Sequence, residues 1–281
     1  MDFRSVPRPN TTAFVDDPRI DVARRLLQSN QFPEAEMVLR TILAKHPDRA
    51  RARFYLALAI HKQKRYAQAR SGFERAIEAG QGFPEIDHAF HFYGWCLYYL
   101  GELPAAQAAF EEHVRRVPTE GDSYFGLGLI AIEDDRVQEA ITDFKTAIDL
   151  QKDNPGRKAD VAKCHARLGD VYLRLDRVEE AGDEYLAAVT LYPNHYEAWA
   201  KRARVLSRLG REQEAKSALR EQEAAMRRVG RLPEGESLPP AESSPDAPPE
   251  PSSDPLSDPS APPTEGADGD GGGGAASMEQ P

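Results

Sequence analysis

The chain has 281 residues, of which 29% are charged and 40% hydrophobic, and its formal net charge is −10. No stretch approaches the roughly 18 uninterrupted apolar residues of a membrane-spanning helix, and the first residues lack the apolar core of a signal peptide. The two cysteines have no Cys-x-x-Cys spacing, which excludes a disulfide framework or a cysteine-rich zinc site and fits a reducing compartment. We therefore expect a cytoplasmic protein without a membrane span.

After a short N-terminal arm, residues 1–15, a pattern recurs six times over residues 16–230. Each occurrence has an alanine after a turn-forming stretch, at Ala35, Ala69, Ala106, Ala140, Ala181 and Ala215. A bulky residue follows four places later, at Leu39, Phe73, Phe110, Phe144, Tyr185 and Leu219. Twelve places before each alanine lies a small residue, at Ala23, Ala57, Gly94, Gly128, Gly169 and Ala203. A spacing of four keeps side chains on one helical face, so each occurrence predicts two antiparallel helices packed closely through small residues.

The pattern resembles the tetratricopeptide repeat, which has Trp-x2-Leu-Gly-x2-Tyr, then Ala-x3-Phe-x2-Ala and a closing proline. The best matches are Tyr93-Gly94 with Leu97, Leu127-Gly128, and Leu168-Gly169 with Tyr172. The resemblance implies an all-α, right-handed α-solenoid of about six helix-turn-helix repeats. The units are predicted at residues 16–49, 50–83, 87–120, 121–154, 162–195 and 196–229. Longer linkers are expected at Gly80–Ile86 and Gln151–Lys158.

Residues 231–281 form a different segment of the chain. They hold 12 of the 22 prolines, 11 acidic residues, one basic residue and no aromatic residue. Such a segment cannot bury enough apolar surface to offset the entropy of ordering it. The sequence therefore predicts a disordered, acidic tail rich in proline, glycine and serine.

In the tetratricopeptide family the first helices of successive units line a concave groove. Transferring the groove positions to units two to four gives the candidate binding residues Phe54, Leu58, His61, His91, Trp95, Tyr98, Phe125, Leu129 and Ile132. Aromatic residues of this kind dominate binding energy at interfaces. We expect an apolar or helical ligand segment there. Alternatively, some of these residues pack between first helices, or the N-terminal arm, with Phe3, Val6 and Phe14, covers the groove.

No catalytic or cofactor-binding motif is present, so we predict no enzymatic activity, no cofactor and no metal site. His88 and His91 lie three residues apart and could place two metal ligands on one helical face, but His61 is not expected to converge with them. The more ordinary interpretation is two surface or groove histidines. His165 follows Cys164 directly, yet adjacent helical residues point about 100° apart, which argues against a nucleophile and its base.

These observations predict a non-catalytic protein-protein interaction scaffold or adaptor that binds a peptide or helical segment. One alternative is a self-associating regulatory or assembly subunit, which would be a homo-oligomer. A weaker alternative is an anion or nucleic-acid binder that uses the basic last repeat, where ten basic residues outnumber five acidic ones. The acidic tail could itself return to this basic repeat.

Overall fold

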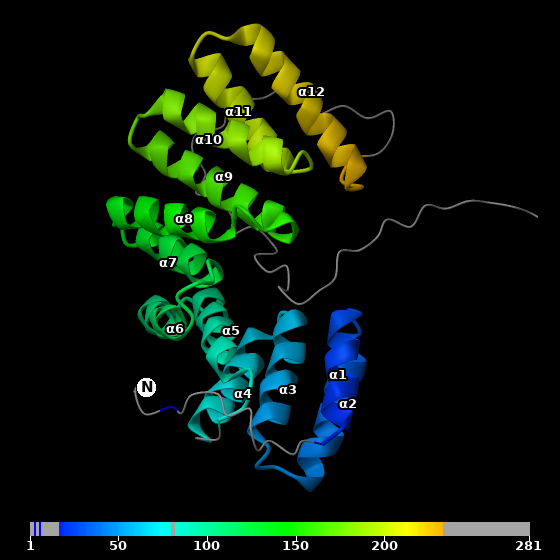
Figure 1. Cartoon of the computed structure of the whole chain (residues 1–281). Helices are drawn as coiled ribbons and strands as arrows, with labels where there is room; N and C mark the ends of the chain where they lie inside the picture. The colour runs from blue at the N-terminus through cyan, green and yellow to red at the C-terminus, as the bar shows by residue number, and fades with distance from the viewer. Residues whose placement is uncertain (1–2, 4–5, 7–16, 80–81, 233–281) are drawn as a thin grey trace, which may run out of the picture.

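A computed structural model describes residues 3, 6, 17–79 and 82–232. Within these residues the chain forms twelve α-helices and no β-strand, arranged as six antiparallel pairs that stack into a curved solenoid (Figure 1). The predicted all-α solenoid is thus confirmed. Most of the predicted N-terminal arm, including Phe14, and the predicted tail beyond Leu232 lie outside the described residues.

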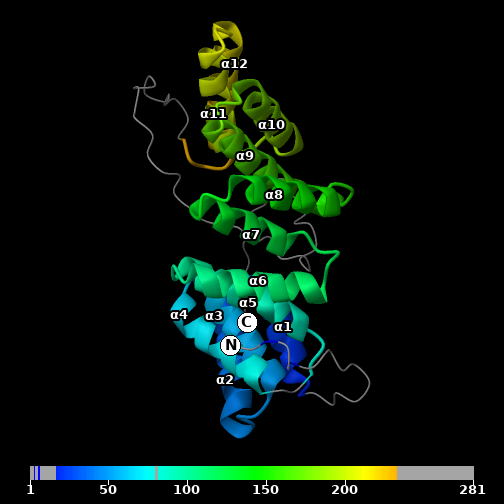
Figure 2. The ribbon, with the colours of Figure 1, turned by 90° about the vertical axis from the view of Figure 1, so that its left-hand side faces the viewer.

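One pair of helices corresponds to each predicted unit. The pairs are α1 (Arg19–Gln28) with α2 (Phe32–Lys45), α3 (Ala50–Lys62) with α4 (Tyr66–Glu78), α5 (Ile86–Tyr99) with α6 (Leu103–Arg116), α7 (Asp122–Glu133) with α8 (Val137–Gln151), α9 (Lys158–Arg174) with α10 (Val178–Leu191), and α11 (Tyr196–Arg208) with α12 (Glu212–Arg228). Helices α5 and α9 begin before the predicted starts of their units at residues 87 and 162. In Figure 2 the helices of the first two units lie at the bottom of the stack and those of the last two units at the top. No helix in the described ranges is long and apolar enough to cross a membrane.

The turn inside every unit has the same backbone feature. The residue five places before each repeated alanine adopts a left-handed conformation, with φ between 57° and 76°, at Asn30, Lys64, Gly101, Asp135, Asp176 and Gly210. Glycine adopts this conformation without steric cost, and Asn and Asp tolerate it. The turn reverses the chain and lets the second helix begin three residues before its alanine.

The repeated small and bulky residues meet in the seam between the two helices of a unit. Phe110 and Phe144 are fully buried, and each ring lies against the glycine of the facing helix. A Cβ atom added at Gly94 would come within 2.7 Å of Phe110, and one at Gly128 within 2.7 Å of Phe144. The helices therefore approach closely because these places lack a side chain, as the sequence pattern predicts.

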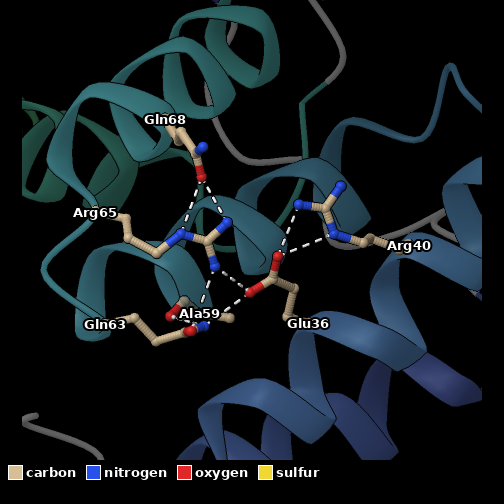
Figure 3. A network of polar contacts seen from close by, with 6 residues as sticks. All are labelled: Glu36, Arg40, Ala59, Gln63, Arg65 and Gln68. Atoms are coloured by element: carbon tan, nitrogen blue, oxygen red, sulfur yellow. Dashed lines mark hydrogen bonds and ion pairs between the residues drawn. The ribbon is translucent and has the colours of Figure 1, made fainter.

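Polar contacts connect neighbouring units along the outer helices (Figure 3). Glu36 in α2 accepts hydrogen bonds from Arg65 (2.7 Å) and Gln63 (2.8 Å), which lie in the turn of the next unit. Arg40 donates to the other oxygen of the same carboxylate. The contact recurs one unit later with its charges exchanged, because Arg70 donates to Glu102 at 2.6 Å. Such part-exposed pairs contribute modestly to stability, but their alternating sign favours this register between units.

The two longer linkers are built differently. After α4, Phe83 turns inward and is fully buried, with its ring 5.5 Å from that of Phe54. After α8, the Asn154 side chain accepts a hydrogen bond from Gly156 N and caps the short 3₁₀ helix η2 (Pro155–Arg157). Helix α9 then begins early and has 17 residues. The extra residues therefore add packing or lengthen a helix, and the stack continues through both linkers.

The first helices of the N-terminal units lie close to one another. Contacts join α1 to α3, α3 to α5, and α5 to α7 directly, in addition to the contacts between chain neighbours. Among the described residues the second helices of successive units have no comparable contacts with one another, so the first helices of these units lie on the inner side of the stack.

Candidate protein-binding surface

The nine predicted groove residues do not share one environment. Six side chains are buried in the free chain, namely Phe54, Leu58, His61, His91, Trp95 and Phe125. The other three, Tyr98, Leu129 and Ile132, are half-buried. Only this second group is accessible to a ligand without rearrangement of the inner helices.

Aromatic packing across units explains the burial. The Phe54 ring lies 5.9 Å from Phe73 and contacts Phe83 from the linker. The Trp95 ring lies 5.3 Å from Phe110 in its own unit and 6.2 Å from Phe125 in the next. Rings of this size bridge consecutive first helices, and such pairs add about 0.5–1.5 kcal/mol beyond their area burial. These residues therefore hold adjacent units together.

The two buried histidines have partners inside the fold. His61 Nδ1 lies 3.2 Å from Cys96 Sγ, and His91 Nδ1 is hydrogen-bonded to Ser123 Oγ at 2.9 Å. Burial lowers the pKa of His61 to about 3 and that of His91 well below its ordinary value. Both imidazoles are consequently neutral near pH 7 and do not supply positive charge to a ligand.

A row of half-buried apolar side chains follows the first helices of units three to five. It consists of Tyr98 in α5, Leu129 and Ile132 in α7, and Leu173 in α9, and we call it the inner apolar row. Each member packs against the main core while keeping part of its surface exposed. Burial, followed by the charge of Glu133, raises the pKa of the Tyr98 hydroxyl, which remains protonated. The row thus offers apolar surface and one hydroxyl group.

A second cluster lies where the beginning of α5 meets the end of α6. His88 Nδ1 and His113 Nε2 lie 3.5 Å and 3.6 Å from Glu120 Oε2, which belongs to the loop before α7. The three ligand atoms lie within 4.8 Å of one another. His91, the sequence neighbour proposed to act with His88, instead pairs with Ser123.

Sequence reasoning missed His113 and Glu120. A signal was nevertheless present, because His113 lies seven places after Ala106, where other units hold Ala76, Ala147 and Ala188. An ionisable residue at a place otherwise occupied by buried alanine is unusual. Its partner Glu120 could not be found from periodicity, since it lies outside both helices.

The described part of the N-terminal arm packs outside the predicted groove. The Phe3 ring lies 5.1 Å from Phe90 and 6.3 Å from Tyr93, and Arg116 donates a hydrogen bond to the Val6 carbonyl. None of these contacts involves a predicted groove residue.

Carboxylates pair with many cations of the last repeat. Lys201 contacts Asp170 at 2.7 Å, and Arg208 pairs with Asp176. Three further ion pairs are Arg211–Glu214, Arg227–Glu223 and Arg228–Glu221. This pairing lowers the net positive field of the repeat that a phosphate backbone would meet.

Both cysteines are buried, and burial raises the pKa of each thiol. A thiol with a raised pKa is a poor nucleophile at neutral pH. His165 Nδ1 lies 2.6 Å from Glu184 Oε2, so its polar partner comes from α10.

Sequence models described as tetratricopeptide repeat match residues 21–83 and 94–155, residues 162–195, and residues 184–217. Together these matches span more than half of the chain and follow the helix pairs. The chain belongs to the tetratricopeptide repeat family. Members of this family are in general protein-protein interaction scaffolds and are typically non-catalytic. No curated protein matches the sequence.

Solved structures of the same family share the fold. A chain of the APC/C hetero-tetramer Cut9-Hcn1 has a TM-score of 0.62 and 22% identity, with 73% of this chain aligned to 39% of that one. Pseudomonas aeruginosa pilF has a TM-score of 0.61 and 16% identity, over 76% of this chain and 90% of that one. YrrB, titled a tetratricopeptide protein with an unusual peptide-binding site, has a TM-score of 0.50 and 14% identity, over 67% and 92%. This chain thus spans well under half of the Cut9-Hcn1 chain.

Proposed function

We propose that the protein is a non-catalytic adaptor that holds an apolar or helical segment of a partner protein along the inner apolar row. The observation that carries the proposal is the row itself, formed by Tyr98, Leu129, Ile132 and Leu173. These side chains lie on the inner helices of three consecutive units. The family's general role in protein interaction and the described peptide-binding site of YrrB support a peptide ligand.

The chemistry of the row favours an apolar ligand. Its members are aliphatic or aromatic, and the histidines closest to it in the repeat pattern are neutral. An amphipathic helix that places apolar residues at i, i+3 and i+7 could pack against successive units. The Tyr98 hydroxyl can then form a hydrogen bond with the ligand backbone or a polar side chain.

The test is affinity capture from a lysate of the native cells with the 281-residue chain and with the double variant Tyr98→Ala, Ile132→Ala. Trp95 is unsuitable for substitution because it is only 1% exposed and its loss would disturb the fold. Met37→Ala is the matched control, since Met37 is a large hydrophobic residue on α2 that is 65% exposed.

We expect a protein that the unchanged chain and Met37→Ala both retain and that the double variant loses, at equal helicity of all three. Loss of one interfacial aromatic anchor alone commonly costs about 2 kcal/mol or more, which is at least roughly thirtyfold in affinity. Equal capture by the double variant would exclude the inner apolar row as the binding surface. Equal loss with Met37→Ala would show that the captured protein binds elsewhere.

A further inference from the structure

We propose that His88, His113 and Glu120 form a binding site for one divalent transition-metal ion of the Zn²⁺ type. The site joins three parts of the chain, namely the first turn of α5, the last turn of α6 and the loop that leads to α7. It is separate from the inner apolar row, and the proposed adaptor function does not depend on it.

The environment of the His113 side chain favours a bound cation. Its side chain is 1% exposed, and within the described part of the chain neither ring nitrogen has a hydrogen-bond partner. Leaving a buried polar group unpaired costs about 1–3 kcal/mol. The same repeat place holds fully buried alanine at Ala76, Ala147 and Ala188, so the fold itself does not need an imidazole there. A bound cation would use the nitrogen that the fold leaves unpaired.

The distances between the three ligand atoms also favour a bound cation. Glu120 Oε2 is 3.5 Å from His88 Nδ1 and 3.6 Å from His113 Nε2, which is longer than an ordinary hydrogen bond. Two atoms bonded tetrahedrally to zinc at roughly 2.0–2.1 Å lie about 3.3 Å apart. Small side-chain adjustments therefore bring the carboxylate and both imidazoles to bonding distance of a single ion.

The types of ligand and the exposure of the site to solvent also fit an ion of the Zn²⁺ type. Two imidazoles and one carboxylate are common ligands of zinc, and they leave a fourth position for water or an external group. His88 and Glu120 are 41% and 34% exposed at their side chains, so an ion can enter from solvent. The arginine whose charge acts on Glu120 is Arg157. It is held by Asp122 (2.5 Å) and Asp160 (3.1 Å), which offset its charge.

Metal binding here would connect unit three to unit four. His88 and His113 belong to the helices of unit three, whereas Glu120 lies two residues before α7, in the loop that leads to unit four. An ion bound only in the folded state stabilises that state, and the stabilisation grows with the logarithm of the ion concentration relative to its Kd. The ion would thus fix the angle at which α7 leaves α6.

The test uses the untagged 281-residue chain, stripped of metal with a chelator and dialysed, and titrated with Co²⁺ and then with competing Zn²⁺. The visible absorption of Co²⁺ reports tetrahedral ligation, and native mass spectrometry counts bound ions. His88→Gln and Glu120→Gln each remove one ligand from a partly exposed position. His165→Gln is the matched control, because His165 pairs with Glu184 in another unit.

We expect one ion per chain, bound with tetrahedral absorption and displaced by Zn²⁺. Each ligand variant should lower the affinity at least about tenfold, while His165→Gln retains it. Zn²⁺ should also raise the melting temperature of the unchanged chain and the control more than that of the ligand variants. If all four proteins bind Co²⁺ equally, or none binds a stoichiometric ion, the proposed site does not exist.

Discussion

The third and sixth units place very different residues at the same repeat positions. In unit three the seam holds Gly94 against Phe110, and Phe110 is fully buried. In unit six the corresponding residues are Ala203 and Leu219, and Leu219 is 38% exposed. Most buried residues from α1 to α10, joined by Val205, form one continuous cluster. Four further residues of the sixth unit form a small cluster made mostly of alanine, and Ala198 belongs to another small cluster with residues of α9 and α10. The repeat pattern determines where side chains meet, and the size of those side chains determines how much stability each unit gains.

This difference has a physical reason in the position of the units. A middle unit is covered on both sides, so large rings at its seams lose contact with water completely. The last unit has one neighbour, and the outer face of α12 carries Glu, Gln, Lys and Arg. A polar outer face keeps the end of a solenoid from associating, at the cost of less apolar burial.

The largest expected effect comes from truncating the same repeat place in both units. Phe110→Ala should lower the free energy of unfolding by about 3–5 kcal/mol, because it leaves a cavity beneath Gly94 and Gly126. Leu219→Ala should cost less than about 1 kcal/mol, since the side chain is partly in water already. Urea unfolding followed by circular dichroism measures both. Similar losses would contradict the view that side-chain size separates the two regions.

The two tryptophans report on the two regions separately. Trp95 lies in the aromatic packing of the third unit, whereas Trp199 packs against the alanine clusters and donates a hydrogen bond to the Pro193 carbonyl. Trp199→Phe leaves only the first fluorophore, and Trp95→Phe leaves only the second. We expect Trp199 fluorescence to change at lower urea concentration, with an opening free energy on the order of 2 kcal/mol smaller.

Circular dichroism of the unchanged chain and of both single-tryptophan variants is the control, because it measures how much stability each substitution removes by itself. Coincident fluorescence transitions would show that all six units unfold as one cooperative body.

Lowering the pH should reduce the difference in folding stability between units two and three and the sixth unit. Burial, and then the charge of Lys62, lowers the pKa of His61 to about 3, whereas an unfolded histidine has a pKa of about 6.5. The stability that neutral His61 contributes is therefore complete above pH 6.5 and is lost as pH falls toward 3, at up to about 1.4 kcal/mol per pH unit. His195 in the sixth unit has a pKa lowered by burial to about 4, but units two and three contain three such histidines.

His61→Leu tests this effect, since Leu27 occupies the same place in the first unit. The variant should show a smaller slope of stability against pH between 6 and 4, measured by urea unfolding at each pH. An unchanged slope would mean that His61 is protonated in the folded chain.

The helix pairs and their seams were predictable from the sequence, because the alanine and the bulky residue four places later carry the contact within a unit. The burial of Phe54 and Trp95 was not, since it depends on how closely consecutive first helices approach. Repeat spacing does not contain that distance. Likewise, His113 stood out as a departure from alanine, but its proximity to Glu120 arises from a loop whose path only the folded chain defines.

The smallest expected effect concerns the fit between small and bulky residues. A methyl group at Gly128 would lie 2.7 Å from the Phe144 ring, so Gly128→Ala should lose roughly 1 kcal/mol despite the better helix propensity of alanine. Ala203→Gly should lose a similar amount for the opposite reason, because the bulky residue of its seam is Leu219 and not an aromatic ring, and glycine weakens the helix.

A double-mutant cycle separates these two causes. Together with Gly128→Ala, Phe144→Leu creates at unit four the Ala–Leu pairing of the sixth unit. The smaller side chain should remove the steric penalty of Gly128→Ala and make the double variant less destabilised than the sum of the single losses. Additive losses would mean that the Phe144 ring does not require the glycine. The second unit already pairs Ala57 with Phe73, and there the close approach is provided by Gly72, where an added Cβ would lie 2.7 Å from Ala57. The glycine that makes room for an aromatic ring can thus lie on either helix of a pair. The combination of a small and a bulky residue therefore predicts close packing better than the residue type at any single position.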